Sequence, residues 1–381
     1  MVKRPYVVAC TVAMATGLLA VVGALALDLP FRDPDGFIGP AYIRLPAIVA
    51  FFLLLDIAPS LIRESRRNGQ VWQNFRMLAS ERWSPGRLAL IIAGLSAFYI
   101  TYVGYRNLKG YLPFVREELV DGPLHTLDRV MMLGHEPGPW LHEVLGTGIW
   151  AQVLSVVYVS YLLFVPMSLG AALVWSRDMT RGFWYVTALC LNWPLGVLSY
   201  YLLPSLGPAF AYSYLYEGLP QTGVMNLQES LLNNRLNILA NPEISTSIQG
   251  IAGFASLHVS VVFTAALFCH RAASPRYLRW LLWGYLVLTV LSTIYFGWHY
   301  ILDDIAGFAI GWLSVAVAQR VTGSEPAARG RRPSASKPVA AQTADHKPDT
   351  NRDEDRHAPP AKHVETPVPA EPVMRSQSPQ S

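Results

Sequence analysis

Charged residues are scarce in this chain of 381 residues. Asp, Glu, Lys and Arg together make up 15% of it, whereas hydrophobic residues make up 52%. A soluble domain usually carries about 25% charged residues, so this composition excludes an ordinary soluble protein. Apolar runs of about twenty residues recur along the sequence, and they predict an all-α, polytopic integral membrane bundle.

Cysteine is scarce as well, and positive charge is only slightly in excess. The three cysteines, Cys10, Cys190 and Cys269, fall inside apolar runs and lack the spacing of metal ligands. We therefore expect neither a disulfide framework nor a cysteine-bound metal. The net charge is +4, and the arginines lie between apolar runs instead of forming one basic surface. Nucleic acid is not an expected partner.

The apolar runs predict about eight transmembrane helices. Arginines follow the second run densely between Arg63 and Arg87, which places that loop in the cytoplasm and leaves both termini inside. The first run is longer than the core of a signal peptide, which favours an uncleaved span over a cleaved leader. The eight runs are approximately 6–27, 45–62, 88–105, 149–175, 183–203, 253–270, 278–295 and 300–317.

The segments between the runs differ in character. Residues 106–148 are mixed and contain several prolines, so we expect an outer loop with short interfacial helices, followed later by a long outer segment at 204–251. Residues 323–381 are rich in Pro, Ala, Lys and Ser, and this composition predicts a disordered cytoplasmic tail. The chain therefore divides into an N-terminal transmembrane pair with a cytoplasmic loop (1–87), a membrane domain (88–322) and the tail (323–381).

Two histidines lie at the mouths of membrane runs. His258 opens the sixth run, and His299 lies in the turn before the eighth, four residues before Asp303. Ionisable groups are costly in a membrane and usually mark a site. If His299 and Asp303 share a helix, their spacing stacks them on one face, where the carboxylate can orient the imidazole. Two imidazoles can then divide the roles of nucleophile and general acid–base. The alternative is a buried structural hydrogen-bond network.

These residues resemble the signatures of the type 2 phosphatidic acid phosphatase superfamily. Its second signature, Pro-Ser-Gly-His, corresponds to Ala255-Ser256-Leu257-His258. Its third, Ser-Arg-x5-His-x3-Asp, corresponds to Ser292-Thr293, then His299 and Asp303 with the same spacing. The Ser-Leu-His variant and the Ser-Thr opening look more like the inositol phosphorylceramide synthase branch. The resemblance covers roughly residues 102–317.

The resemblance implies a role for each matching residue. His299 attacks phosphorus and forms a phosphohistidine, and Asp303 holds its imidazole in the right tautomer. His258 protonates the leaving oxygen and then deprotonates the acceptor. Ser256 can hydrogen-bond a phosphate oxygen. No metal and no cofactor are implied, because cations and N–H donors can stabilise the phosphoryl group.

The sequence departs from the family at the phosphate-binding cations. Thr293 stands where the third signature has arginine, and the region of the first signature, residues 200–208, holds no basic residue. We expect Arg106 and Lys109 to bind phosphate, with Arg235 as a further candidate. The alternative is that these residues are cations near lipid headgroups. The match of Lys109 and Arg116 to the Lys-x6-Arg spacing of the first signature is interpreted as chance.

Three further histidines and two glycines each allow two interpretations. His125, His135 and His142 lie near acidic residues, but their spacing fits no tight ligand pattern, which favours a polar interfacial structure over a metal site. Gly307 and Gly311, four residues apart, indicate either close helix packing or ordinary small residues.

These observations predict a membrane enzyme that acts on a phospholipid or polyprenyl-phosphate substrate at the outer membrane face. The branch resemblance favours transfer of a phospho-headgroup, such as inositol phosphate from phosphatidylinositol, to a lipid or glycan hydroxyl. The alternative is hydrolysis of a lipid phosphate or polyprenyl pyrophosphate. A third reading, a catalytically silent lipid-binding protein, is disfavoured by the intact His258, His299 and Asp303.

Overall fold

The structure is a computed structural model, and it describes residues 5–34, 41–176, 178–243 and 248–324. The described residues form helices and no strand, which confirms the predicted all-helical fold. The predicted tail from residue 325 onward lies outside the described residues. The division of the chain at residues 87 and 322 stays a prediction.

Each of the eight predicted runs coincides with a helix. Six of these helices are long and apolar enough to cross a membrane. The remaining two, α8 and α11, are not among those six. A count of eight spans therefore stays a prediction. The eight helices are α1 (Val7–Ala26), α2 (Ala41–Asn68), α4 (Pro85–Val115), α7 (Ile149–Gly170, continued by a π-helical turn at Ala171–Trp175), α8 (Met179–Leu202), α11 (Leu257–Arg271), α12 (Arg276–Tyr295) and α13 (Ile301–Thr322).

One predicted boundary is wrong. The third span was expected to end near Tyr105, but α4 continues for ten more residues to Val115 and includes Pro113. The extension is buried through Tyr111 and Leu112, and α1 packs along α4. Tertiary packing therefore outweighs the polar and proline content on which the loop prediction rested. As a result, Arg106 and Lys109 lie inside a helix.

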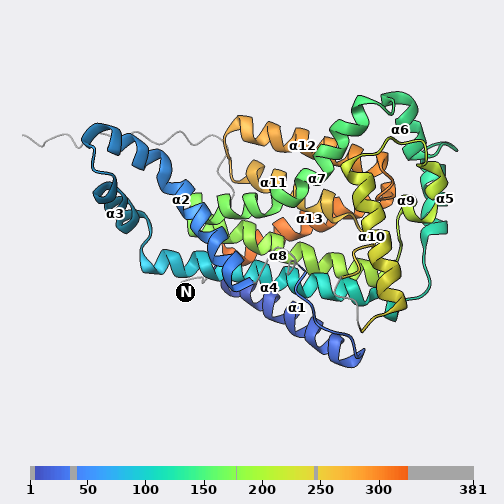
Figure 1. Cartoon of the computed structure of the whole chain (residues 1–381), viewed down its shortest axis with the longest axis horizontal. Helices are drawn as coiled ribbons and strands as arrows, with labels where there is room; N and C mark the ends of the chain where they lie inside the picture. The colour runs from blue at the N-terminus through green and yellow to red at the C-terminus, as the bar shows by residue number, and fades with distance from the viewer. Residues whose placement is uncertain (1–4, 35–40, 177, 244–247, 325–381) are drawn as a thin grey trace, which may run out of the picture. The chain divides into compact units, whose positions relative to one another are not determined.

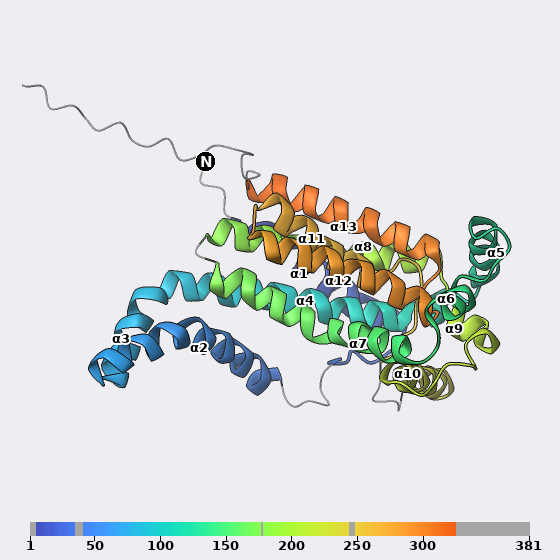
Figure 2. The same cartoon turned by 90° about the horizontal axis from the view of Figure 1, so that it is seen from above.

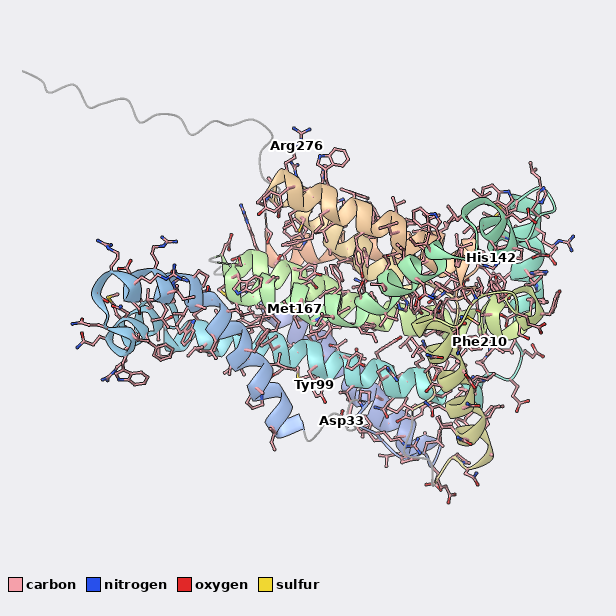
Figure 3. The ribbon with its side chains drawn as sticks, turned by 45° about the horizontal axis from the view of Figure 1, so that its top comes forward. Asp33, Tyr99, His142, Met167, Phe210 and Arg276 are labelled. Carbon is pink, nitrogen blue, oxygen red and sulfur yellow. The ribbon has the colours of Figure 1, made fainter. Side chains whose placement is uncertain are left out.

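The short helices gather at one end of the long ones (Figures 1 and 2). The expected short helices within 106–148 are confirmed as α5 (Asp121–Met131) and α6 (Pro137–Leu145). The segment 204–251 contains α9 (Pro208–Ala211), a 3₁₀ turn at Ser213–Leu215 and the unexpected α10 (Gly223–Ala240). At the other end, α3 (Val71–Arg82) follows α2. Figure 3 shows the two ends of the bundle along α12, which starts at Arg276 and ends beside His142.

The centre of the bundle is α8, which packs against α4, α11 and α13. Its residues from Gly182 to Cys190 are all buried, so α8 is apolar on every side instead of amphipathic. Helices α11 and α13 pack closely because α13 presents glycines to α11. A Cβ atom on Gly311 would lie 2.7 Å from the carbonyl oxygen of Ser260. The close-packing reading of Gly307 and Gly311 is therefore confirmed.

Candidate active site

His299 and Asp303 are brought together by the turn that leads into α13. The Nδ1 atom of His299 lies 3.3 Å from the Oδ2 atom of Asp303, and both side chains are buried. Their pairing was expected from a shared helical face, but α13 begins only at Ile301. Asp303 lies in the first turn, where Oδ2 also accepts the Tyr300 N–H at 3.0 Å. Helix capping therefore positions the carboxylate, and this corrects the expected geometry.

The contact with Asp303 defines which nitrogen of His299 is free. If Asp303 is ionised, its carboxylate can only accept a hydrogen bond, so this contact places the proton on Nδ1 and leaves the lone pair on Nε2. Burial lowers the pKa of His299 to about 4, partly opposed by the nearby carboxyl of Asp304. The imidazole is therefore neutral at neutral pH. A neutral, oriented imidazole is the form that can attack phosphorus.

His258 lies in the first turn of α11, opposite His299. The two imidazole ring centroids are 6.2 Å apart. The ring of His258 packs on Tyr158, with centroids 4.4 Å apart, and on Tyr161 at 4.2 Å. Both tyrosines come from α7, so two helices, α7 and α11, and the turn before α13 meet at the histidine pair. A phosphorus atom between the two rings could be reached from both sides.

Ser256 joins the two motifs. Its hydroxyl accepts the Val259 N–H at 3.4 Å and so caps α11. Its own backbone N–H donates to the carbonyl oxygen of Asp303 at 2.9 Å. The side chain is fully buried, so the start of α11 and the start of α13 form one rigid unit. Ser256 thus lies at the site, as the sequence predicted.

The three predicted phosphate-binding cations, Lys109, Arg106 and Arg235, have different surroundings. Lys109 lies at the site: its charge acts on both His258 and His299, and its Nζ lies over the Tyr200 ring, 4.9 Å from the centroid. Arg106 lies one turn away, and its charge acts on Lys109. Arg235 is on α10, where its charge interacts with Asp121. The structure therefore brings Lys109 to the histidines, Arg106 beside Lys109, and Arg235 beside a carboxylate outside the pair.

Asp121 was not expected at the site. Its carboxylate accepts the backbone N–H groups of Leu206 and Gly207 and, at 2.9 Å, the hydroxyl of Tyr300. It therefore ties the segment after α8 to the turn that carries His299. No spacing in the sequence marks this residue, because its partners are 85 to 179 positions away.

Asp128 was also missed. Its Oδ1 accepts the Ile301 N–H at 3.0 Å, so it supports the first turn of α13 from α5. Burial raises the pKa of Asp128 to about 7, although the bond from Ile301 opposes this. A cavity beside the turn is lined by Asp128, His125, Glu136, Tyr216, His299 and Tyr300. Asp128 and His299 therefore line the same cavity.

Thr293, where the family has arginine, is paired with a carboxyl group. Its hydroxyl lies 3.0 Å from Oδ2 of Asp304, and both residues are buried. Asp304 directly follows Asp303, and its charge interacts with His299. Asp303 alone was predicted at the site, although the neighbouring Asp304 is visible in the sequence.

Two of the three histidines of the 106–148 segment, His125 and His142, contact other side chains or backbone. His125 stacks on Tyr212 at 4.1 Å and lies 3.4 Å from Glu136, and Nε2 of His142 lies 2.8 Å from the Tyr295 carbonyl oxygen. Figure 3 shows His142 at the same end of the long helices as Phe210, whose ring contacts Trp298. Among the described residues, no three His, Cys, Asp or Glu side chains are grouped as metal ligands, and the interfacial location of these histidines stays a prediction.

Comparisons with known proteins agree with the motifs. A family model described as the PAP2 superfamily matches residues 122–317. A lipid A 4'-phosphatase of Porphyromonas gingivalis is 37% identical over 62 residues, which are 16% of this chain and 26% of the relative. The chain thus matches about a quarter of that relative's length. No solved structure matches the chain.

Proposed function

Since the chain belongs to the PAP2 superfamily, we propose that it is a membrane-embedded lipid phosphotransferase that works through a phosphohistidine on His299. One observation carries the proposal. A buried imidazole, oriented by a carboxylate at 3.3 Å, faces a second imidazole at a centroid distance of 6.2 Å. This is the arrangement that a nucleophile and a general acid require.

In the first step, Nε2 of His299 forms a bond to phosphorus. The bond from phosphorus to the leaving oxygen breaks, and a proton passes from His258 to that oxygen. Asp303 keeps the Nδ1 proton in place and offsets the positive charge that develops on the ring.

In the second step, an acceptor oxygen attacks the phosphohistidine. His258, now neutral, takes the proton of the acceptor hydroxyl, the bond from phosphorus to Nε2 breaks, and His299 is restored. The acceptor is a lipid or glycan hydroxyl in transfer, or water in hydrolysis.

Lys109 and Ser256 are the proposed phosphate-binding residues at the histidines. Lys109 supplies a positive charge that reaches both imidazoles. Ser256 supplies a hydroxyl at the N-terminus of α11, where backbone N–H groups also favour an anion. Arg106 and Arg235 complete the proposed set of phosphate-binding residues.

The proposed donor is a phospholipid such as phosphatidylinositol, whose phospho-headgroup moves to the acceptor. The second candidate is hydrolysis of a lipid phosphate or polyprenyl pyrophosphate. The similarity to a lipid A 4'-phosphatase favours this second candidate. The Ser-Leu-His and Ser-Thr variants of the two signatures favour the first.

The site is proposed to face the outside, with both termini in the cytoplasm. Arginines lie in the last turn of α2 and at the two helix ends on either side of the turn between α11 and α12, namely Arg66, Arg67, Arg271 and Arg276. The histidine pair lies at the opposite ends of α11 and α12. Because cytoplasmic loops are enriched in Lys and Arg, the histidine end would be external.

The test uses purified protein in liposomes with headgroup-labelled phosphatidylinositol and a membrane lipid extract as acceptor. A polyprenyl pyrophosphate labelled in its phosphates runs in parallel, and His299→Ala is the control for both. Label on a new lipid or glycan supports transfer, and release of free phosphate from the pyrophosphate supports hydrolysis. Absence of both reactions, together with absence of label on the protein, would contradict an enzymatic role and favour a lipid-binding protein.

A further inference from the structure

Helices α2 and α3 form a hairpin at the end of the bundle away from the short helices of the histidine end (Figure 1). The link between them is only two residues long, Gly69 and Gln70, and Gly69 turns the chain with a φ of +71°. The side-chain amides of Asn68 and Asn74 donate to each other's oxygens at 3.1 and 2.8 Å. The start of α3 is therefore fixed on the end of α2.

The far end of α3 is also bound to α2. Nη1 of Arg82 donates to the carbonyl oxygen of Asp56 at 2.7 Å, and Nη2 donates to the hydroxyl of Ser60 at 2.7 Å. At a rise of about 1.5 Å per residue, Asp56 lies about 18 Å before the end of α2. Helix α3 therefore runs back beside the last turns of α2. Because α2 is long and apolar enough to cross a membrane, α3 would lie where that helix leaves the bilayer.

The outward face of α3 combines an arginine with large apolar side chains. Asn74 and Leu78 are buried on the side that faces α2. Trp72 and Arg76 lie one turn apart on the opposite side, and both are exposed. Trp72 is 67% exposed and Met77 is 53% exposed. Tryptophan and arginine together on one helix face are typical of the boundary between a membrane and water.

The same hairpin carries an excess of exposed positive charge. Residues 56–82 contain five arginines and three acidic residues. Two of the acids are paired within the described hairpin, Asp56 with Arg82 at 3.4 Å and Glu64 with Arg67 at 3.7 Å. Four arginines are exposed, namely Arg63, Arg66, Arg67 and Arg76. A basic surface at the end of a membrane helix attracts anionic lipid headgroups.

We propose that the exposed face of the α2–α3 hairpin, residues 56–82, binds anionic lipid headgroups in the leaflet at which α2 ends. The arginines pair with the lipid phosphates, and Trp72 and Met77 contact the acyl chains beneath them. A lipid surface fits better than a protein partner, because both ends of α3 are tied to α2 at the level where the bilayer would end. The hairpin lies outside residues 122–317, which the family model matches, so this binding is independent of the phosphohistidine chemistry.

The experiment compares two lipids with the same acyl chains, anionic dioleoyl phosphatidylglycerol and zwitterionic dioleoyl phosphatidylcholine. Each is titrated into full-length protein in a neutral detergent at low salt, and the rise in unfolding temperature gives its dissociation constant. We expect the wild type to prefer phosphatidylglycerol. Arg66→Gln combined with Arg76→Gln should weaken phosphatidylglycerol binding by about 30-fold and leave phosphatidylcholine binding unchanged. Trp72→Ala should weaken the binding of both lipids alike.

The matched control removes two exposed arginines from other turns at the same end of the bundle, Arg181→Gln combined with Arg276→Gln. It should keep most of the preference for phosphatidylglycerol. Equal losses in the two double variants would overturn the assignment to the hairpin, because total charge would then explain the binding. A wild type that binds both lipids equally would overturn it as well and would leave the surface to a protein partner. If the hairpin variant is unstable without lipid, Arg76→Gln alone replaces it, with an expected loss of about fivefold.

Discussion

Gly311 of α13 lies so close to Ser260 of α11 that a methyl group on it would come within 2.7 Å of the Ser260 carbonyl oxygen. One turn nearer the site, Gly307 approaches the carbonyl oxygen of Ser256 in the same way. This close crossing is what brings the start of α13, with Asp303, against the start of α11, with His258. The geometry of the histidine pair therefore depends on glycines that take no part in the chemistry.

Gly311→Ala should destabilise the protein and lower its activity. The added carbon meets the Ser260 backbone at 2.7 Å and Phe263 at 2.9 Å, so one helix must shift, at a cost of about 1–3 kcal/mol. Thermal unfolding in detergent measures the effect. Gly284→Ala on α12 is the control, because nothing lies within 4 Å of its added carbon. Equal unfolding temperatures for the two variants would show that the crossing tolerates a wider separation.

His299→Ala should abolish covalent phosphorylation and reduce turnover by more than about 10³-fold, because no other group offers a free nitrogen oriented by Asp303. Acid-quenched labelling with a ³²P-labelled donor measures the intermediate. His135→Ala, on an exposed histidine, is the control and should label normally. Substantial turnover by His299→Ala would remove His299 from the role of nucleophile.

His258→Ala should slow formation of the phosphohistidine by about 10²–10³-fold and change substrate binding less, because the leaving oxygen then departs without a proton. Single-turnover labelling separates the rate from the binding constant. A p-nitrophenyl phosphodiester, whose leaving group needs little protonation, should lose much less rate. An equal loss on both donors would argue that His258 has a binding role.

Asp303→Asn should fold but lose about 10³-fold in rate. The amide oxygen of asparagine can still accept the Tyr300 N–H and cap α13, but it does not balance the charge on the attacking imidazole. Circular dichroism and unfolding temperature report the fold, and the burst of phosphohistidine reports the chemistry. A folded variant with an unchanged rate would reduce Asp303 to a capping residue.

Stability should fall as the pH is lowered from 6.5 to 4, and His299 should cause part of this loss. The unfolded chain protonates a histidine near pH 6.5, whereas burial lowers the pKa of His299 to about 4 in the folded protein. The unfolded state therefore binds more protons than the folded state between these pH values. Acidification should lower the free energy of unfolding by up to about 3 kcal/mol through this group.

The matching variant for that measurement is His299→Gln, which cannot be protonated in this range. Unfolding temperatures of wild type and variant are compared at pH 7, 5.5 and 4.5. The wild type should lose more stability than the variant on acidification. Parallel curves would mean that His299 is solvated and titrates normally in the folded protein.

The sequence alone determined the helical membrane fold and predicted the candidate reacting groups. Apolar runs predict helices directly, because a bilayer requires both length and internal hydrogen bonding. His258, His299 and Asp303 were identified because each lies in a short motif. Residues that are a few positions apart in such a motif are also close in the folded structure. The sequence also placed His299 in the turn before the eighth run, where it lies in the structure, but it did not reveal that Asp303 caps α13.

Only the tertiary structure decided what surrounds these groups. Lys109 reaches the histidines because α4 continues past its predicted end and packs beside α8. Asp121 supports the His299 turn through a hydrogen bond from Tyr300, which is 179 positions away in the chain. Arg235, on α10, interacts electrostatically with Asp121. Such contacts join residues that are far apart in the chain and follow no period, so no local pattern encodes them. The candidate reacting groups could therefore be predicted from short motifs, whereas the charged residues around them are placed by how the helices pack.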